Sequence, residues 1–489
     1  MKKNVLLILT DQQRKDSLGC YGNPIINTPS LDKLSEDGVR FNKCYVANPI
    51  CMPNRLSIFT GMYPRNHGLW TNGLLLNQEL RTLASELSDN GYETASFGKI
   101  HFEPYGADAD SGSMESTAYW EQRKNNIDWF GPYWGFNHVE LTIGHTNPVA
   151  HYIKWFEENG GTPEMLTVEK VTGAMMSGVR NIPKELHDSN FVSNRTVEFI
   201  KKRDKNKPFF AVASFPDPHH PFDPPRECAK KYANKKVVAP IGSREDLNTR
   251  PEHYKKHFKG GWHRKGDIPE TRPNGVGPEH EHEIIANTYA MVDLIDENIG
   301  KITKYLEEEN LIEDTIIIFT SDHGELLGDH GLWYKGPFFY DGLVNVPLIV
   351  SCPGFISPYE SNALISSVDI FPTICDLIDV QIPNYVVGVS HKEHLFNHSI
   401  ENRDKCLIEY RNGYGSNDCS SKVLVTKDYK YVRYQNGESE LTDIKKDPEE
   451  KINVAHDSKY AEITNKMNEC LLDEILSTEN KYPEQLSLA

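Results

Sequence analysis

The sequence contains no CxxC motif, although nine cysteines are scattered among its 489 residues. Structural zinc sites and dithiol redox centres usually place two cysteines two residues apart, so neither kind of site is expected. The odd number of cysteines and their irregular spacing also argue against a disulfide framework. This pattern favours a reducing compartment.

Long apolar runs are also missing. No stretch approaches the about 18 consecutive apolar residues of a membrane-spanning helix. The run Val5–Leu9 follows Lys2 and Lys3, but it is shorter than the roughly 7–15 apolar residues of a signal peptide, and Asp11 follows closely. We therefore predict a cytoplasmic protein with no membrane partner.

Positive charge is scarce relative to negative charge. The chain has 53 Lys and Arg against 70 Asp and Glu, a formal net charge of −17. A broadly acidic surface repels nucleic acids and anionic membranes, so neither is expected as a partner. A small anionic substrate is still compatible with a local basic pocket, and the oligomeric state is left open.

Short apolar runs alternate with helical patterns through most of the chain. The runs end in polar or glycine residues and are typical of strands buried on both faces of a sheet. Such alternation predicts a doubly wound α/β layer whose ligands bind at the carboxyl ends of the strands. The predicted strands are 5–9, 94–97, 209–213, 315–319 and 347–350, and the predicted helices are 28–37, 53–60, 82–90 and 283–308.

The pattern changes after residue 383. Residues 423–426, 429–434 and 440–443 predict a short antiparallel meander, and 459–476 predict a final helix. We therefore predict two domains, a catalytic α/β domain over 1–383 and a smaller subdomain over 384–489. Segments 112–178 and 217–283 have irregular patterns and are predicted to be surface loops around the mouth of the site.

Acidic residues follow two of the predicted strands. Asp11 and Gln12 end the first strand, and Asp322 and His323 follow strand 315–319. Carboxylates at neighbouring strand ends converge and repel each other, and a hard divalent cation such as calcium, magnesium or manganese resolves that repulsion. The alternative is that each aspartate only caps the helix that follows it.

Cys51 and Arg55 lie at the start of a predicted helix and share one helical face. The partial positive charge of a helix N-terminus suits an anion. A thiolate nucleophile also needs a base close by. The alternative is that Cys51 is a small buried residue, as cysteine commonly is.

The pattern Cys51-x-Pro53-x-Arg55, followed by Thr60-Gly61, resembles the signature of the sulfatases, in which the cysteine is oxidised to formylglycine. Other stretches resemble sulfatase motifs in the same order along the chain. They are 4–11, 27–32 and 38–41 (matched to the first helix), 98–101 (GKxH), 218–221 (PHxP), 320–324, 328–331, Lys335, 368–373 and 443–448.

The resemblance implies an alkaline-phosphatase-like fold, with a large mixed, mostly parallel sheet sandwiched by helices and a smaller C-terminal α+β subdomain built on a short antiparallel sheet. It also implies one divalent cation, calcium first and manganese or magnesium as alternatives. A maturase would be a transient partner that converts Cys51. The metal ligands carried over are Asp11, Gln12, Cys51, Asp322 and His323.

The resemblance assigns the catalytic roles as well. The hydrate of formylglycine 51 would attack sulfur, with Arg55 holding it. His219 would protonate the leaving alcohol, with His220 as the alternative, and His101 would deprotonate the second hydroxyl. Lys99 and Lys335 would neutralise the sulfate oxygens. His330 is expected to be structural, and Asn72 and Asn345 are further polar candidates.

Two positions depart from the common sulfatase pattern. Many sulfatases have a second aspartate at the position of Gln12 and an asparagine at that of His323, and the variants found here also resemble phosphonate monoester hydrolases. With these residues, the role of Gln12 as a ligand is undecided. The site also has fewer carboxylates, which shifts the expected metal preference from calcium toward manganese. The sequence favours hydrolysis of an organic sulfate, with a carbohydrate sulfate suggested by aromatic residues in the loops. The alternatives are a phosphonate monoester or phosphodiester hydrolase and a binding protein with an unused pocket.

Overall fold

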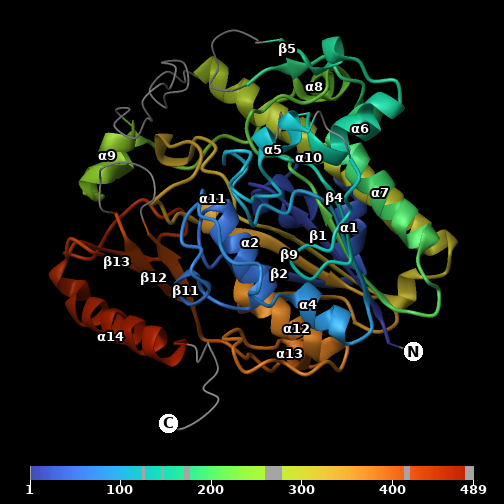
Figure 1. The fold of residues 1–489 in the computed structure, drawn as a ribbon. Helices are drawn as coiled ribbons and strands as arrows, with labels where there is room; N and C mark the ends of the chain where they lie inside the picture. Colours follow the sequence, from blue (N-terminus) through green and yellow to red (C-terminus); the bar gives the residue numbers. More distant parts are fainter. Residues whose placement is uncertain are drawn as a thin grey trace.

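The computed structural model describes residues 2–123, 127–144, 148–169, 177–258, 278–411 and 419–479. Its centre is an eight-stranded sheet with the order β10-β2-β9-β8-β1-β7-β3-β4 (Figure 1). The strands are β1 (Asn4–Thr10), β2 (Gly38–Tyr45), β3 (Glu93–Gly98), β4 (His138–Leu141), β7 (Phe209–Ser214), β8 (Thr315–Ser321), β9 (Asn345–Ser351) and β10 (Tyr359–Ser366).

The sheet is mixed and mostly parallel, as expected. Strands β4, β3, β7, β1 and β8 run parallel to one another, and β10 runs parallel to β2. Strand β9 is antiparallel to both of its neighbours, β8 and β2. The register pairs Thr10 with Ser321, so β1 and β8 end side by side.

Helices cover both faces of the sheet because the side chains of a strand alternate between them. Leu6 and Ile8 of β1 pack into a core with α1 (Pro29–Glu36), α7 (Asp188–Lys202) and α10 (Pro278–Glu308). The remaining apolar side chains of β1 pack into a second core with helices that lie together in Figure 1. These helices are α2 (Cys51–Thr60), α4 (Leu83–Asp89) and α12 (Ile370–Leu377).

The C-terminal part forms the antiparallel sheet that the sequence predicted. Its order is β11-β12-β13-β14, and α14 lies along it (Figure 1). The first of these strands was not among those expected from the sequence. The elements are β11 (Lys405–Tyr410), β12 (Ser421–Thr426), β13 (Tyr429–Tyr434), β14 (Ser439–Asp443) and α14 (Ala461–Ser477). The proposed domain boundary between 383 and 384 stays a prediction.

Two sequence expectations were wrong in part. Residues 38–41, matched to a helix, begin β2, where a side chain at Gly38 would come 2.4 Å from the carbonyl oxygen of Val350 in the neighbouring strand. The segments expected to be loops contain regular elements, and β4 among them forms an edge of the main sheet. A strand of four residues is too short to show a periodic pattern. Parts of both segments, 124–126, 145–147, 170–176 and 259–277, lie outside the described residues.

Short 3₁₀ helices lie between the elements, and the remaining α-helices and strands in the described ranges are short. They are α3 (Pro64–His67), α5 (Thr117–Gln122), α6 (Ala150–Glu158), α8 (Arg226–Tyr232), α9 (Glu252–Phe258), α11 (Asp341–Val344), α13 (Lys392–Phe396), β5 (Val168–Glu169) and β6 (Val179–Arg180). All nine cysteines lie in described ranges and are free thiols. Within those ranges, no helix combines the length and the apolar character needed to cross a membrane.

Candidate active site

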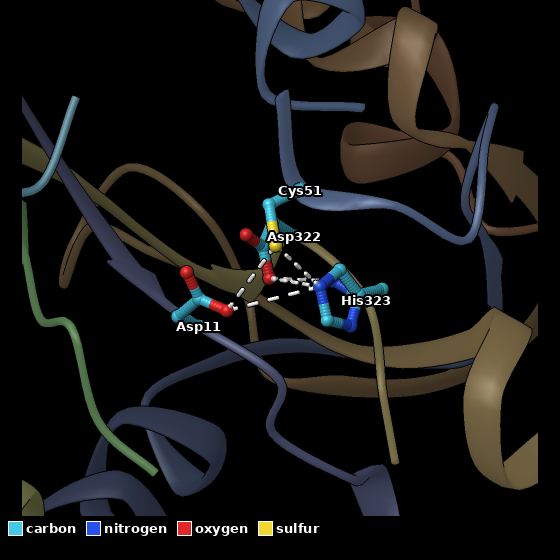
Figure 2. Close-up of side chains that lie close together, drawn as sticks. All are labelled: Asp11, Cys51, Asp322 and His323. Atoms are coloured by element: carbon cyan, nitrogen blue, oxygen red, sulfur yellow. Dashed lines mark hydrogen bonds and ion pairs between the residues drawn. The ribbon is translucent and has the colours of Figure 1, made fainter. Parts of the chain in front are cut away.

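The predicted metal ligands meet where β1 and β8 end and α2 begins. One ligand atom from each of Asp11, Cys51, Asp322 and His323 lies within 4.8 Å of the other three, and all four residues are buried. Figure 2 shows the four side chains pointing toward one another. His323 Nδ1 donates to the carbonyl oxygen of Gly324 at 2.8 Å, which directs Nε2 into the group, 3.1 Å from Cys51 Sγ.

Gln12 lies directly beside this group. Its backbone N–H donates to Asp322 Oδ1 at 3.0 Å, and its side-chain amide donates to His220 Nδ1 at 3.0 Å and to Glu325 at 2.5 Å. Its amide oxygen is buried and has no donor among the described residues. Two carboxylates, an imidazole nitrogen and an orphaned amide oxygen fit a hard divalent cation. Whether Gln12 is a ligand stays a prediction.

Three cationic side chains converge on the same point from three different elements. Arg55, in α2, pairs with Asp322 at 2.7 Å and with Asp11 at 3.2 Å. Lys99, which follows β3, forms an ion pair with Asp11. Lys335 Nζ lies 2.7 Å from Cys51 Sγ. Lys335 thus contacts the Cys51 sulfur atom, and Arg55 and Lys99 contact the carboxylates beside it, so the site is suited to an anionic substrate.

This arrangement changes the acidity of Cys51. Burial and the charge of Asp11 raise the pKa of the thiol, but Lys335, His323 and Lys99 outweigh them, and the pKa is lowered overall. Burial alone would lower the pKa of Lys335, but the negative charge of Cys51 and of the nearby carboxylates raises it, so its ammonium keeps its charge. The site therefore stabilises negative charge at residue 51.

His101 is the clearest candidate for a proton acceptor. Its side chain is 3% exposed, and both ring nitrogens are without a hydrogen-bond partner in the part of the chain that the structure describes. Burial, followed by the charges of Lys99 and Arg55, lowers its pKa well below the usual value, so the imidazole is neutral. The Glu115 carboxylate holds this loop by accepting the backbone N–H of His101 at 2.5 Å and that of Phe102 at 2.8 Å.

His219 and His220 stack on each other with ring centres 3.9 Å apart. Nδ1 of His219 contacts the backbone carbonyl oxygen of His220. His220 accepts the Gln12 amide N–H at Nδ1, and its ring lies tilted by 44° against that of Tyr334, with ring centres 4.4 Å apart. The hydrogen bond ties His220 to the metal-ligand side of the site. Which of the two histidines is the acid stays a prediction.

The three remaining polar candidates have different positions. Asn72 borders the site, because its side-chain oxygen accepts the backbone N–H of Met52 in the first turn of α2 at 3.1 Å. The side chain of Asn345 instead holds the backbone of Cys44, at 3.3 Å. His330 stacks on Tyr340 with ring centres 3.9 Å apart, which agrees with the structural role expected for it.

Sequence reasoning missed two buried glutamates beside the site, Glu325 and Glu115. Burial raises the pKa of each to about 7. Glu325 directly follows the motif at 320–324 and precedes two leucines, so its position beside that motif was the available signal. Glu115 lies in a segment with no motif, and nothing in the sequence distinguished it from a surface residue.

A second buried cluster lies next to the site. His187, Asp188 and Asp217 place one potential ligand atom each within 4.8 Å of the others. His187 pairs with Asp188 at 3.0 Å and with Asp217 at 3.6 Å. Burial, together with the charge of Asp188, raises the pKa of Asp217 to about 8. This cluster supports the loop that carries His219 and His220, because Asp217 precedes that loop and its carbonyl oxygen accepts the N–H of Asp11 at 3.2 Å.

Comparisons with known proteins find relatives along nearly the whole length of the chain. The arylsulfatase of Clostridium perfringens is 29% identical over 514 residues, covering 99% of this chain and 96% of that protein. The N-acetylglucosamine-6-O-sulfatase of Bacteroides thetaiotaomicron is 25% identical and covers 99% of this chain and 87% of its own length. Both similarities extend over nearly the whole chain.

Solved structures show the same fold. The phosphonate monoester hydrolase of Agrobacterium radiobacter superposes with a TM-score of 0.83 at 27% identity, covering 100% of this chain and 98% of that one. A protein solved with its substrate D-glucosamine-2-N,6-O-disulfate superposes with a TM-score of 0.76 at 21% identity and full coverage of both chains.

Two family descriptions match the sequence. Residues 328–477 match the C-terminal region of N-sulphoglucosamine sulphohydrolase, and residues 3–380 match the sulfatase family. The second match covers well over half of the chain and includes every residue of the candidate site. The protein therefore belongs to the sulfatase family of hydrolases, within the alkaline-phosphatase-like superfamily.

Proposed function

We propose that this sulfatase hydrolyses an organic sulfate monoester, with residue 51 acting as the nucleophile after its oxidation to formylglycine. The observation that carries the proposal is the convergence of Arg55, Lys99 and Lys335 around residue 51. A sulfate monoester is an anion, and charge shifts onto its oxygens as the ester bond breaks. Fixed cations at that point stabilise the transition state.

A divalent cation, with calcium first and manganese or magnesium as alternatives, would be held by Asp11, Gln12, Asp322, His323 and residue 51. When bound, it would supply positive charge that polarises the sulfate group. Arg55 bridges Asp11 and Asp322 and so keeps both carboxylates in place. The same guanidinium donates to the backbone carbonyl oxygen of Lys99 at 2.7 Å, which positions that lysine as well.

The residues of the chain account for the proton transfers. One hydroxyl of the hydrated residue 51 first gives up its proton to solvent, since the surrounding cations stabilise negative charge at this position. The resulting alkoxide attacks sulfur, the bond from sulfur to the ester oxygen breaks, and His219 or His220 gives a proton to the leaving alcohol. The neutral His101 then takes the proton of the second hydroxyl. Breaking the bond between residue 51 and sulfate restores the aldehyde and releases the product. Water adds to the aldehyde and regenerates the hydrate.

We further propose a carbohydrate sulfate as the substrate. Support comes from the names of two relatives, the N-acetylglucosamine-6-O-sulfatase and a Δ4,5-hexuronate-2-O-sulfatase of the same Bacteroides species. Conversion of Cys51 requires a maturase as a transient partner. A cytoplasmic location is proposed on the basis of the nine free thiols.

The second candidate is a phosphonate monoester or phosphodiester hydrolase with the same nucleophile. This candidate is favoured by the presence of glutamine at position 12 and histidine at position 323, and by the similarity to the phosphonate monoester hydrolase. Lys99 and His101, at the positions of the sulfatase GKxH motif, favour a sulfate ester.

A rate comparison on one aryl leaving group separates the two functions. The protein is produced with a maturase, and mass spectrometry confirms a loss of about 18 Da at residue 51, the mass balance of thiol oxidation to an aldehyde. We expect a higher kcat/KM for the aryl sulfate than for the aryl phosphonate monoester, and no turnover of either by Cys51→Ala. A higher value for the phosphonate would reverse the assignment. An unmodified Cys51 after production with a competent maturase would instead favour a binding protein.

A further inference from the structure

Glu325 is buried beside the candidate metal site and accepts three N–H groups. Its side chain is 1% exposed. Oε1 accepts the backbone N–H of Leu327 at 3.1 Å and that of Tyr334. Oε2 accepts the side-chain amide of Gln12 at 2.5 Å. Both carboxylate oxygens therefore accept hydrogen bonds, one from the loop that leads to Lys335 and the other from Gln12.

This contact determines the orientation of the Gln12 amide. The amide nitrogen carries two hydrogens, and its two acceptors are Glu325 Oε2 and His220 Nδ1. Rotation of the amide by 180° would place its oxygen against a carboxylate, which is acceptor-only when ionised. The amide oxygen is consequently the one polar atom of the side chain left without a partner in the described residues. It is the atom available to a cation.

The same amide also determines the tautomer of His220. Nδ1 accepts the Gln12 N–H, so the proton of the neutral ring is on Nε2. His220 then has an N–H donor at Nε2. A general acid needs such a donor, and so does a group that binds a sulfate oxygen. One amide group thus links the metal-ligand residues to the histidine pair.

We propose that Glu325 is a positioning residue that orients the Gln12 amide, so that its oxygen is offered to the cation and its N–H to His220. The inference rests on the proposed metal site and deepens it, because it explains how a neutral glutamine could serve where many sulfatases use a second aspartate. Residues behind metal ligands typically change metal affinity or activity by about 10–100-fold when altered.

A double-mutant cycle on metal affinity tests the proposal. The protein is stripped of metal with a chelator and titrated calorimetrically with CaCl2 and MnCl2 at pH 8. Glu325→Gln keeps the size of the side chain but has only one acceptor oxygen, and Gln12→Met removes the amide. We expect each variant to weaken the Kd by about 10–100-fold. The double variant should bind no more weakly than Gln12→Met, because Glu325 acts through Gln12.

Glu115→Gln is the matched control. Glu115 is an equally buried glutamate that accepts backbone N–H groups at the edge of the site, but it does not contact Gln12. We expect it to leave the metal Kd within about twofold of the parent, with its melting temperature recorded beside that of Glu325→Gln. An equal loss of metal affinity in both would indicate general loosening and would overturn the proposal.

Two further outcomes would also overturn it. One is an unchanged Kd in Glu325→Gln, and the other is a double variant whose loss equals the product of the two single losses. Because the titration uses no substrate, failure to cleave sulfate esters would refute the proposed function and leave this coupling intact. A parent protein that binds neither cation would remove the metal site and this inference together.

Discussion

Two buried clusters of histidine and aspartate lie next to each other in this protein, and they differ in the groups that neutralise their charges. The first contains Asp11, Cys51, Asp322 and His323, and the second contains His187, Asp188 and Asp217. The hydrogen bond from Asp11 to the Asp217 carbonyl oxygen joins them. Both clusters are buried and combine one histidine with two aspartates, and the first adds a cysteine.

The difference lies in what neutralises the charges. In the second cluster, His187 lies between two aspartates and forms an ion pair with Asp188, whereas burial and the charge of Asp188 raise the pKa of Asp217 to about 8, so its carboxyl is neutral at pH 7. In the first cluster, cations from three separate elements surround the group, and the Gln12 oxygen beside it lacks a donor among the described residues. The second cluster is neutralised by its own ion pair and by one nearby cation, Arg180, and supports the fold, whereas the first, with three cations around it, is prepared for ligands.

The largest expected effect comes from Cys51→Ala. It removes the reacting group, so we expect kcat/KM on a sulfate ester to fall by at least about 10⁴-fold with the melting temperature nearly unchanged. Cys228→Ala, at another buried free thiol, is the control and should keep full activity. Activity of Cys51→Ala within tenfold of the parent would contradict the assignment of the nucleophile.

The next effect compares the clusters directly. Asp322→Asn removes a proposed ligand and the partner of Arg55, so we expect loss of bound metal by elemental analysis and a rate loss of roughly 10³-fold or more. Asp188→Asn alters the second cluster and should lower the melting temperature while leaving the metal content unchanged. Loss of metal from Asp188→Asn, or its retention in Asp322→Asn, would invalidate the comparison.

The sequence predicted the first cluster because its aspartates come just after predicted strands. Asp11 and Asp322 each follow a buried strand, and parallel strands place their carboxyl ends at one edge. The sequence did not predict the second cluster, because neither His187 nor Asp217 belongs to one of the matched motifs, and His187 follows no predicted strand. Glu325 was missed for a related reason, since only the structure reveals that its carboxylate is buried and accepts hydrogen bonds.

A third effect separates the two histidines by leaving group. An alkyl alkoxide needs its proton during bond cleavage, whereas a nitrophenolate leaves with little help. The variant of the true acid, His219→Ala or His220→Ala, should lose roughly 10²–10⁴-fold on an alkyl sulfate and far less on nitrophenyl sulfate. The other variant should show equal losses on both substrates. If neither variant shows leaving-group dependence, the role inferred from the PHxP resemblance is wrong.

A smaller effect is expected for one of the surrounding cations. Lys335→Met removes the ammonium 2.7 Å from residue 51 and keeps most of the side-chain volume. We expect kcat to fall by about 10²–10³-fold, as when one preorganised donor is lost from a transition state. Lys301→Met, which removes a hydrogen bond to Asn190 in the helical layer, serves as control. Equal effects of the two substitutions on kcat would show that Lys335 acts only through stability.

The smallest effect concerns the proton in the second cluster. The pKa of Asp217 is about 8 in the folded protein, above its usual value of 3.8, because burial and Asp188 disfavour its charge. Between those values the folded state binds a proton that the unfolded state lacks. The free energy of unfolding therefore falls as pH rises, by at most about 1.4 kcal/mol per pH unit from this group, and levels off above pH 8.

Asp217→Asn tests this linkage, because asparagine imitates the protonated side chain at every pH. His187, whose pKa is also raised, contributes in the same direction but keeps its partner Asp188 in the variant. The difference between parent and variant therefore isolates Asp217. In urea denaturation at pH 6, 7 and 8, the variant should gain stability relative to the parent at each step. Parallel curves would show that Asp217 is ionised in the folded state, and the second cluster would then need a cation as the first one does.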